Sequence, residues 1–127
     1  GGSWLVFSDR RLKKNIKEYT NGLSDLLKIH PIKYHYNELL GCDTTREYVG
    51  VIAQELKEIA PYMTQSVNIK GTDYLEVDNS AMTYMLINAV KEIHSKYETL
   101  NTKNEEQKKQ IKLLQKQIDE LKVLIKK

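Results

Sequence analysis

The residues from Leu86 to Ile125, LINAVKEIHSKYETLNTKNEEQKKQIKLLQKQIDELKVLI, decide the shape of this protein. Apolar residues recur there at alternating spacings of four and three, the heptad pattern of a coiled coil. No proline or glycine follows Gly71, so we expect one continuous helix of roughly 70 Å. The a and d positions are, in chain order, Leu86, Val90, Ile93, Tyr97, Leu100, Asn104, Gln107, Ile111, Leu114, Ile118, Leu121 and Ile125.

The apolar stripe of this helix is too long to be buried by the small remainder of the chain. The helix must therefore pair with copies of itself. Ile at a with Leu at d favours two strands in a parallel coil, whereas Tyr97 is bulky for a tight dimer seam. Asn104 and Gln107 break the stripe, and buried polar residues of this kind fix the register of a coil at some cost in stability.

The sequence before the long helix predicts a small head built of short helices and strands. Asp78 or Asn79 is a suitable N-cap for the long helix, because both side chains accept hydrogen bonds from a first helical turn. Alternation and turn signals indicate, in order, a short helix at 23–27 ended by Pro31, strands at 32–37 and 47–52, a helix closed by Pro61, and a hairpin of strands 63–69 and 74–77. The predicted fold class is α+β, a head of short strands and helices followed by a long C-terminal helix.

Composition excludes several classes of protein. The formal charge of +3 over 127 residues is too small to favour a nucleic-acid partner. No apolar run approaches about 18 residues, so no membrane partner is expected. Cys42 is the single cysteine, which excludes an internal disulfide framework. The three histidines show no metal-ligand spacing with Cys42, and no glycine-rich phosphate loop is present, so neither a metal nor a cofactor is predicted.

The first residues have the character of a junction. Gly1-Gly2-Ser3 is either an expression scar or the end of a longer natural chain, and Trp4–Phe7 is apolar enough to be a strand continuing from an upstream segment. We therefore expect three parts: residues 1–7 as this junction, 8–79 as the head, and 80–127 as the coil.

The stretch Ser8–Ile16, SDRRLKKNI, holds a candidate nucleophile and a candidate base. A Ser–Lys pair is a known variant of the nucleophile–base arrangement. If Ser8 attacks the Phe7 carbonyl, an ester forms that water hydrolyses, leaving one chain that ends at Phe7 and another that begins at Ser8. Lysine has an ordinary pKa of about 10.4 and a useful base needs roughly 7–8, so Lys13 requires desolvation or neighbouring cations. Suitable cations are Arg10, Arg11 and Lys14.

The spacing of Ser8 and Lys13 constrains this hypothesis. Residues five apart lie on opposite faces of a strand and about 140° apart on a helix. Either a turn intervenes between them or the partner comes from another subunit, and the residues alone leave both open.

Four stretches of the chain together resemble a known family. SDRRLKKNI at Ser8–Ile16, GVIAQEL at Gly50–Leu56, YLEVD at Tyr74–Asp78 and LINAVKEI at Leu86–Ile93 are similar to the S74 self-cleaving intramolecular chaperone domains of phage tail spikes, tail fibres and neck appendages. The resemblance implies a catalytic dyad of Ser8 and Lys13, a supporting Asp9, and cleavage between Phe7 and Ser8. It also matches family positions of structural character at Asn15, Gly50, Ile52, Ala53, Gln54 and Glu55. Of these, Gln54 and Glu55 fit a helix start better than a catalytic pair.

The same resemblance implies a cellular role. Three copies would align an upstream β-rich fibre or spike of the same chain in the host cytoplasm, and a single self-cleavage would then release the chaperone from the mature fibre. Two alternatives remain. One is an oligomerisation module without chemistry, and the other is the self-cleaving domain of a membrane-bound transcription regulator.

Overall fold

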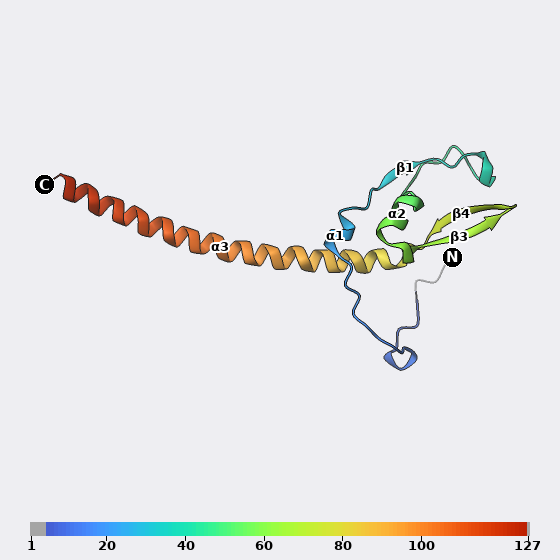
Figure 1. Cartoon of the computed structure of the whole chain (residues 1–127), viewed down its shortest axis with the longest axis horizontal. Coiled ribbons are helices and arrows are strands. Elements are labelled where there is room, and N and C mark those ends of the chain that lie inside the picture. Colours follow the sequence, from blue (N-terminus) through green and yellow to red (C-terminus); the bar gives the residue numbers. More distant parts are fainter. Residues whose placement is uncertain (1–4, 127) are drawn as a thin grey trace.

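The computed structural model describes residues 5–126 and divides them between a head and one long helix (Figure 1). Helix α3, Met82–Ile125, runs for 44 residues, which is about 66 Å at about 1.5 Å per residue. The head contains short helices and strands packed at the N-terminal end of α3. The predicted α+β class with a long C-terminal helix is confirmed.

Two antiparallel hairpins form the strands of the head. β1, Ile32–Tyr34, pairs with β2, Tyr48–Gly50, so that Ile32 faces Gly50. β3, Thr64–Ile69, pairs with β4, Thr72–Val77, in one unbroken register. The second hairpin turns at Lys70 and Gly71, which have φ values of 50° and 87°, as a tight two-residue hairpin turn requires. The predicted hairpin is confirmed, whereas the first two predicted strands are shorter than expected.

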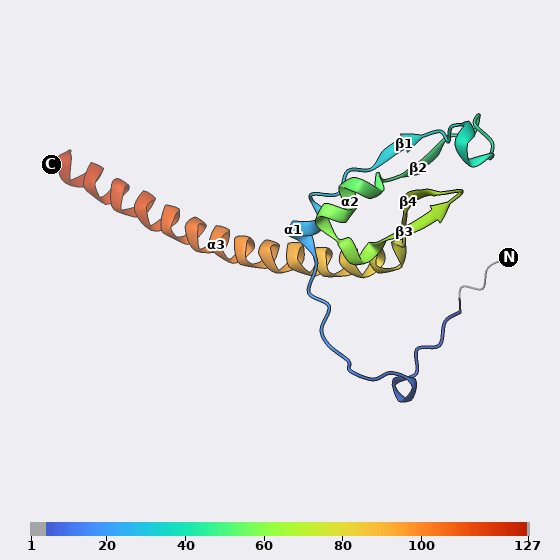
Figure 2. The same cartoon turned by 45° about the vertical axis from the view of Figure 1, so that its right-hand side comes forward.

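Two short helices complete the head. Helix α1, Leu23–Leu26, lies against α3, and helix α2, Ala53–Ile59, lies between the β1–β2 pair and α3 and contacts the β3–β4 hairpin (Figures 1 and 2). A 3-10 helix that begins at Pro61 follows α2, as expected for a residue that cannot continue a helix. Asp78 caps a final 3-10 turn, Asn79–Ala81, through a hydrogen bond from Ser80 N to its Oδ1, and α3 follows directly.

The core lies where α2 meets the first turns of α3. Leu56, Ala60, Met63 and Met85 are buried in one cluster, and Ala89 is buried next to them on α3. Burial of a large apolar side chain such as Leu56, Met63 or Met85 contributes about 1.5–3 kcal/mol. The first turns of α3 are therefore part of the head as well as of the long helix.

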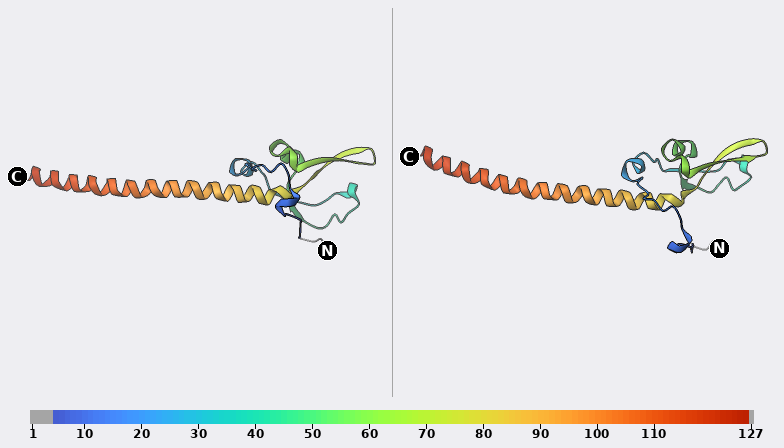
Figure 3. Two further views of the ribbon diagram at one scale, coloured as in Figure 1. Left: turned by 90° about the horizontal axis from the view of Figure 1, so that it is seen from below. Right: turned by 60° about the horizontal axis from the view of Figure 1, so that its bottom comes forward.

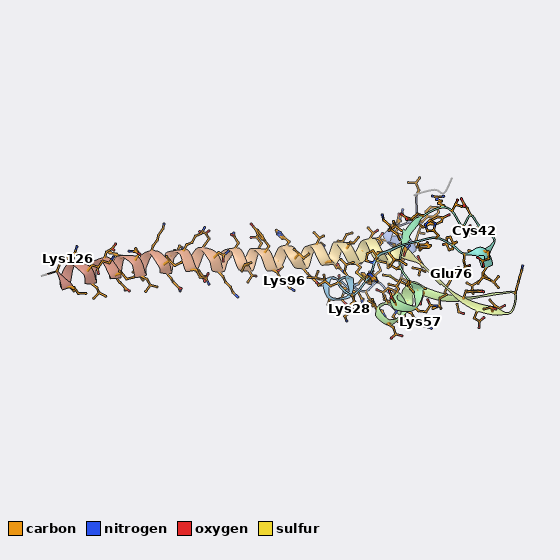
Figure 4. The ribbon with its side chains drawn as sticks, turned by 90° about the horizontal axis from the view of Figure 1, so that it is seen from above. Lys28, Cys42, Lys57, Glu76, Lys96 and Lys126 are labelled. Atoms are coloured by element: carbon orange, nitrogen blue, oxygen red, sulfur yellow. The ribbon has the colours of Figure 1, made fainter. Side chains whose placement is uncertain are left out.

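Beyond this core, α3 carries no buried residue in the described chain. Every position from Lys91 to Lys126 is exposed, including the apolar stripe, with Tyr97 61% and Leu121 57% exposed. Figure 4 shows Lys96 and Lys126 on the bare length of the helix, while Lys28, Cys42, Lys57 and Glu76 lie on the head. None of the described helices has both the length and the apolar character of a membrane span.

Residues 5–18 form an arm that leaves the head. The arm is exposed throughout, and its one regular element is a 3-10 helix, Arg10–Leu12. In Figures 1 and 2, and in the right-hand view of Figure 3, the arm lies on the opposite side of α3 from the hairpins. The prediction of a strand at Trp4–Phe7 is wrong for Leu5–Phe7, which belong to no helix or strand; Trp4 lies outside the described residues.

Candidate active site

The arm brings Ser8 and Lys13 together. Lys13 Nζ donates a hydrogen bond to Ser8 Oγ across 2.7 Å. Between them lies the 3-10 helix Arg10–Leu12, whose backbone hydrogen bonds run from Leu12 N to Asp9 O (3.0 Å) and from Lys13 N to Arg10 O (3.1 Å). This turn folds the chain back, so that side chains five residues apart meet within one chain.

Asp9 stabilises this turn from its first residue. Its backbone is extended (φ −62°, ψ 131°), and its Oδ1 accepts a hydrogen bond from Arg11 N at 2.8 Å, the geometry of an N-cap. The Arg11 side chain turns back onto the same carboxylate, with Nη2 2.8 Å from Oδ2. These hydrogen bonds from the Arg11 side chain and backbone hold the pKa of Asp9 below its ordinary value. The carboxylate therefore holds the turn in shape, and its hydrogen bonds go to Arg11.

The chemistry of the pair depends on the proton that the two groups share. A lysine ammonium donates to Ser8 Oγ, whereas a neutral amine at the same distance accepts the hydroxyl proton and makes the oxygen a nucleophile. Ser8, Lys13 and the three neighbouring cations are all exposed in the described chain, and Phe7 is 94% exposed. The bond between Phe7 and Ser8 is thus presented on an open arm, with water on the groups that would act on it.

The remaining predicted site residues lie elsewhere in the fold. Asn15 has a φ of 54° at the bend after the Ser8–Lys13 turn, and asparagine adopts this left-handed conformation more readily than most residues. The other five form the junction between β2 and α2 in the head. Gly50 makes room for a tyrosine ring, because an added Cβ would lie 3.1 Å from Tyr34 Cε1.

At this junction the helix begins as predicted. The carbonyl of Ile52, the N-cap of α2, accepts a hydrogen bond from Leu56 N at 3.0 Å, and Ala53, Gln54 and Glu55 form the first turn. None of these residues shares a hydrogen bond with Ser8 or Lys13 among those described. Gly50 and Ile52–Gln54 also line a cleft of about 710 Å³ between the two hairpins, whose walls come from residues 34–79 and not from the arm.

Two residues that sequence reasoning missed hold the base of the arm. Asn88 and Glu92 of α3 make hydrogen bonds to the segment Tyr19–Leu23. The heptad pattern hides them, because they lie on the face away from the a and d positions, where residues are ordinarily exposed to solvent. The available signal is Asn88 itself, a poor helix former placed among the apolar residues of LINAV.

Within residues 5–126, no group of three or more histidine, cysteine, aspartate or glutamate side chains is placed to hold a metal ion.

Comparison with known proteins identifies relatives of this chain. Residues 8–65 match the model of the family Peptidase_S74, described as chaperone of endosialidase. The long tail fiber protein Gp37 of Enterobacteria phage M1 is 35% identical over 101 residues, which are 76% of this chain and 39% of that protein. Gp37 of Enterobacteria phage K3 is 30% identical over 99 residues, 77% of this chain and 8% of that protein. A probable tail fiber protein of Escherichia phage Phieco32 is 38% identical over 101 residues, 76% of this chain and 13% of that protein. The chain thus spans less than half the length of each of these relatives.

Proposed function

The chain carries a domain of the Peptidase_S74 family, the chaperone of endosialidase, and from this premise we propose that it is the chaperone of a phage tail fibre that releases itself by self-cleavage. Three copies join through α3 and align the fibre segment that precedes them. The bond between Phe7 and Ser8 is then cut once. Residues 8–79 act as the head and residues 80–127 as the coil, while residues 1–7 end the fibre.

The hydrogen bond of 2.7 Å between Lys13 Nζ and Ser8 Oγ is the observation that carries the cleavage proposal. Neutral Lys13 takes the hydroxyl proton as Ser8 Oγ attacks the Phe7 carbonyl carbon. The C–N bond breaks, and the proton passes from Lys13 to the departing amine, which is the α-amino group of Ser8. Water then hydrolyses the ester between Phe7 and Ser8 Oγ, which gives a carboxylate on Phe7 and restores the Ser8 hydroxyl.

The exposure of the arm supports cleavage that waits for assembly. In the single chain, water surrounds Ser8 and Lys13, and apolar side chains of the arm lie open, with Leu12 68% and Ile16 56% exposed. A neighbouring chain or the folded fibre would cover these apolar residues and take the Lys13 ammonium out of water. Desolvation favours the neutral amine, the form that acts as a base. A chain without the fibre is therefore expected to cut slowly.

The exposed stripe of α3 supports assembly of several chains. Leu100, Ile111, Leu114 and Leu121 are each more than half exposed although their spacing is that of a coiled-coil seam. A parallel coil buries them and brings the three heads to one end. Fibre strands that pair between chains form slowly, because loop closure costs entropy before the contacts form. Holding three chain ends together raises the local concentration of those strands.

The test is the denatured mass of the chain expressed together with its fibre segment. Wild type is expected to give a product that begins at Ser8, while Ser8→Ala and Lys13→Ala stay uncut. Lys17→Ala is the matched control, because it removes an exposed cation of the same arm that is not among the cations assigned to Lys13, and it should still cut. Cutting in the Ser8→Ala variant would assign the cleavage to another protease.

A second candidate function needs no chemistry. The exposed stripe of α3 suffices for a trimerising module in which Ser8 and Lys13 are ordinary surface residues. This reading predicts that wild type, Ser8→Ala and Lys13→Ala are all uncut and assemble alike.

A further inference from the structure

The arm joins the packed part of the molecule through the segment Tyr19–Leu23, which hydrogen-bonds to α3. Asn88 Nδ2 donates hydrogen bonds to two backbone carbonyls, Tyr19 O at 2.8 Å and Asn21 O at 2.9 Å. One turn further along α3, Glu92 Oε2 accepts a hydrogen bond from Leu23 N at 3.0 Å. We call Asn88 and Glu92 the clamp.

The clamp binds backbone groups, so the segment Tyr19–Leu23 has to lie close to α3. A Cβ added at Gly22 would lie 2.7 Å from Glu92 Oε1 and 3.1 Å from Asn88 Cβ. A residue other than glycine would therefore displace the Glu92 carboxylate from its place beside Leu23 N and crowd Asn88. Gly22 has an extended φ of −154°, so the glycine is needed here for space and not for a left-handed backbone.

The clamp also ties α1 to α3. Leu23 N is the first backbone donor of α1 and finds no partner within its own short helix. Glu92 supplies that partner, and its negative charge suits the N-terminal end of a helix. One carboxylate thereby fixes both the start of α1 and the end of the arm.

The clamp and the apolar stripe occupy different faces of the same stretch of α3. With about 100° between successive residues, Glu92 lies about 20° from buried Met85, on the side of the head, whereas Asn88 and Val90 are about 160° apart. Assembly through the stripe therefore leaves the clamp in place. The clamp and the first residues of the apolar stripe both lie within Leu86–Ile93, so the arm leaves α3 at the level where the coil begins.

Between the clamp and the Ser8–Lys13 pair, the chain has little to hold it. Residues 14–18 are exposed and belong to no helix or strand. Tyr19 is the next residue along, and its Oη lies 2.6 Å from Tyr62 Oη of the head. The direction in which the arm departs is thus set at Tyr19–Leu23.

We infer that Asn88 and Glu92 are positioning residues, which fix the level on α3 at which each chain presents Ser8, Lys13 and the Phe7–Ser8 bond to the fibre end or neighbouring chain that would cover them. This inference rests on the proposed self-cleavage. In a parallel coil, identical clamps place all the arms at one level, next to the same end of the fibre. A released arm sweeps a larger volume and meets the covering fibre end or neighbouring chain less often.

Two measurements on the full chain with its fibre segment test this role. The first is amide hydrogen exchange over residues 19–23 in a Ser8→Ala background, which stays uncut. The second is the rate of self-cleavage with Ser8 intact. Asn88→Ala and Glu92→Ala are expected to lose protection at residues 19–23 and to cut about tenfold more slowly, because the arm meets the covering fibre end or neighbouring chain less often. The mass of the assembled oligomer should not change.

Rescue and control variants separate positioning from general stability. Glu92→Gln keeps a carbonyl oxygen that can accept from Leu23 N, so it should restore most of the cleavage rate that Glu92→Ala loses. Gly22→Ala disturbs the same contact from the opposite side, and combining it with Glu92→Ala should add little to either alone. Glu98→Gln, an exposed glutamate two turns further along α3, should behave as wild type.

Each outcome either supports or overturns the positioning role of Asn88 and Glu92. Cleavage at the wild-type rate despite lost protection at residues 19–23 would overturn the positioning role, and so would unchanged protection in both alanine variants. Loss of the oligomer in those variants would make the residues structural parts of the assembly instead. If wild type itself stays uncut, the proposed function fails. The exchange at residues 19–23 then decides by itself whether the clamp fixes the arm.

Discussion

At the scale of single residues, Asp9 organises the turn on which the proposed chemistry depends. It caps the 3-10 helix through Arg11 N and pairs with the Arg11 side chain, and Lys13 reaches Ser8 across that turn. The contribution of Asp9 is therefore geometric. It shortens the path between two side chains that a helix or a strand would keep apart.

We predict that the turn loosens in acid. The pKa of Asp9 is lowered by its hydrogen bonds to the Arg11 side chain and backbone, so the charged carboxylate is favoured in the folded turn. A lowered pKa contributes stability that is present above the unfolded value of about 3.8 and is lost as the pH falls through the folded value. A carboxyl-carbon NMR titration should place Asp9 below an ordinary aspartate. Arg11→Ala should move it back toward that value, and an unchanged titration in this variant would contradict the pairing.

The sequence predicts a turn between Ser8 and Lys13 as one of two alternatives. A separation of five residues excluded a regular helix or strand and left a turn or a second subunit as the alternatives, and the structure places a turn there. The role of Asp9 was left open, because one aspartate can cap, pair or catalyse and the sequence does not show which donor it faces. The clamp residues were missed because their partners are backbone groups of a distant segment, which leave no side-chain signature.

At the scale of elements, the head depends on α2 and the first turns of α3. Leu56 of α2 is 1% exposed and packs with Met63 and Met85. Side chains from three separate elements thus meet in one small cluster. The head and the beginning of the long helix are expected to unfold together.

We predict that Leu56→Ala destabilises the head by about 3 kcal/mol, because it removes a fully buried side chain and leaves a cavity. Chemical denaturation followed by circular dichroism at constant protein concentration measures the loss. Leu27→Ala is the matched control, since Leu27 is 75% exposed, and it should change the free energy of unfolding by less than about 0.5 kcal/mol. An equal loss in both variants would mean that the head is buried differently in the assembled protein.

Elements with strong local signals were the ones that sequence patterns predicted well. The β3–β4 hairpin follows from Lys70–Gly71, because glycine accepts the positive φ that the turn needs. The first pair of strands was predicted too long, since alternation continues past Tyr34 while the pairing does not. The strand predicted at Trp4–Phe7 is absent at Leu5–Phe7, because an apolar run by itself does not specify a strand.

At the scale of the whole molecule, the head and α3 differ in how much of their apolar surface is buried. The head buries a handful of residues, whereas α3 extends an uncovered stripe over most of its 44 residues. Association through this stripe is proposed to contribute much of the stability of the assembled protein. Stability should then depend on protein concentration.

We predict that Leu114→Asp dissolves the oligomer, because a charge at a d position would be buried in the seam without a partner. Light scattering during size-exclusion chromatography should show the mass fall from that of three chains to about that of one, 14.8 kDa. Lys116→Asp introduces the same carboxylate on the outer face of α3 and should leave the mass unchanged. A single-chain mass for wild type would contradict assembly through α3.

The bare stripe also determines the fate of a chain that finds no partners. An unassembled chain exposes an apolar surface several nanometres long, the kind of surface that cellular chaperones and proteases recognise in damaged or unassembled proteins. In the proposed assembly this surface is buried, so assembled chains would escape such recognition, whereas unassembled chains would be degraded or would aggregate. The helix proposed to join the chains would thereby also mark unassembled copies for removal.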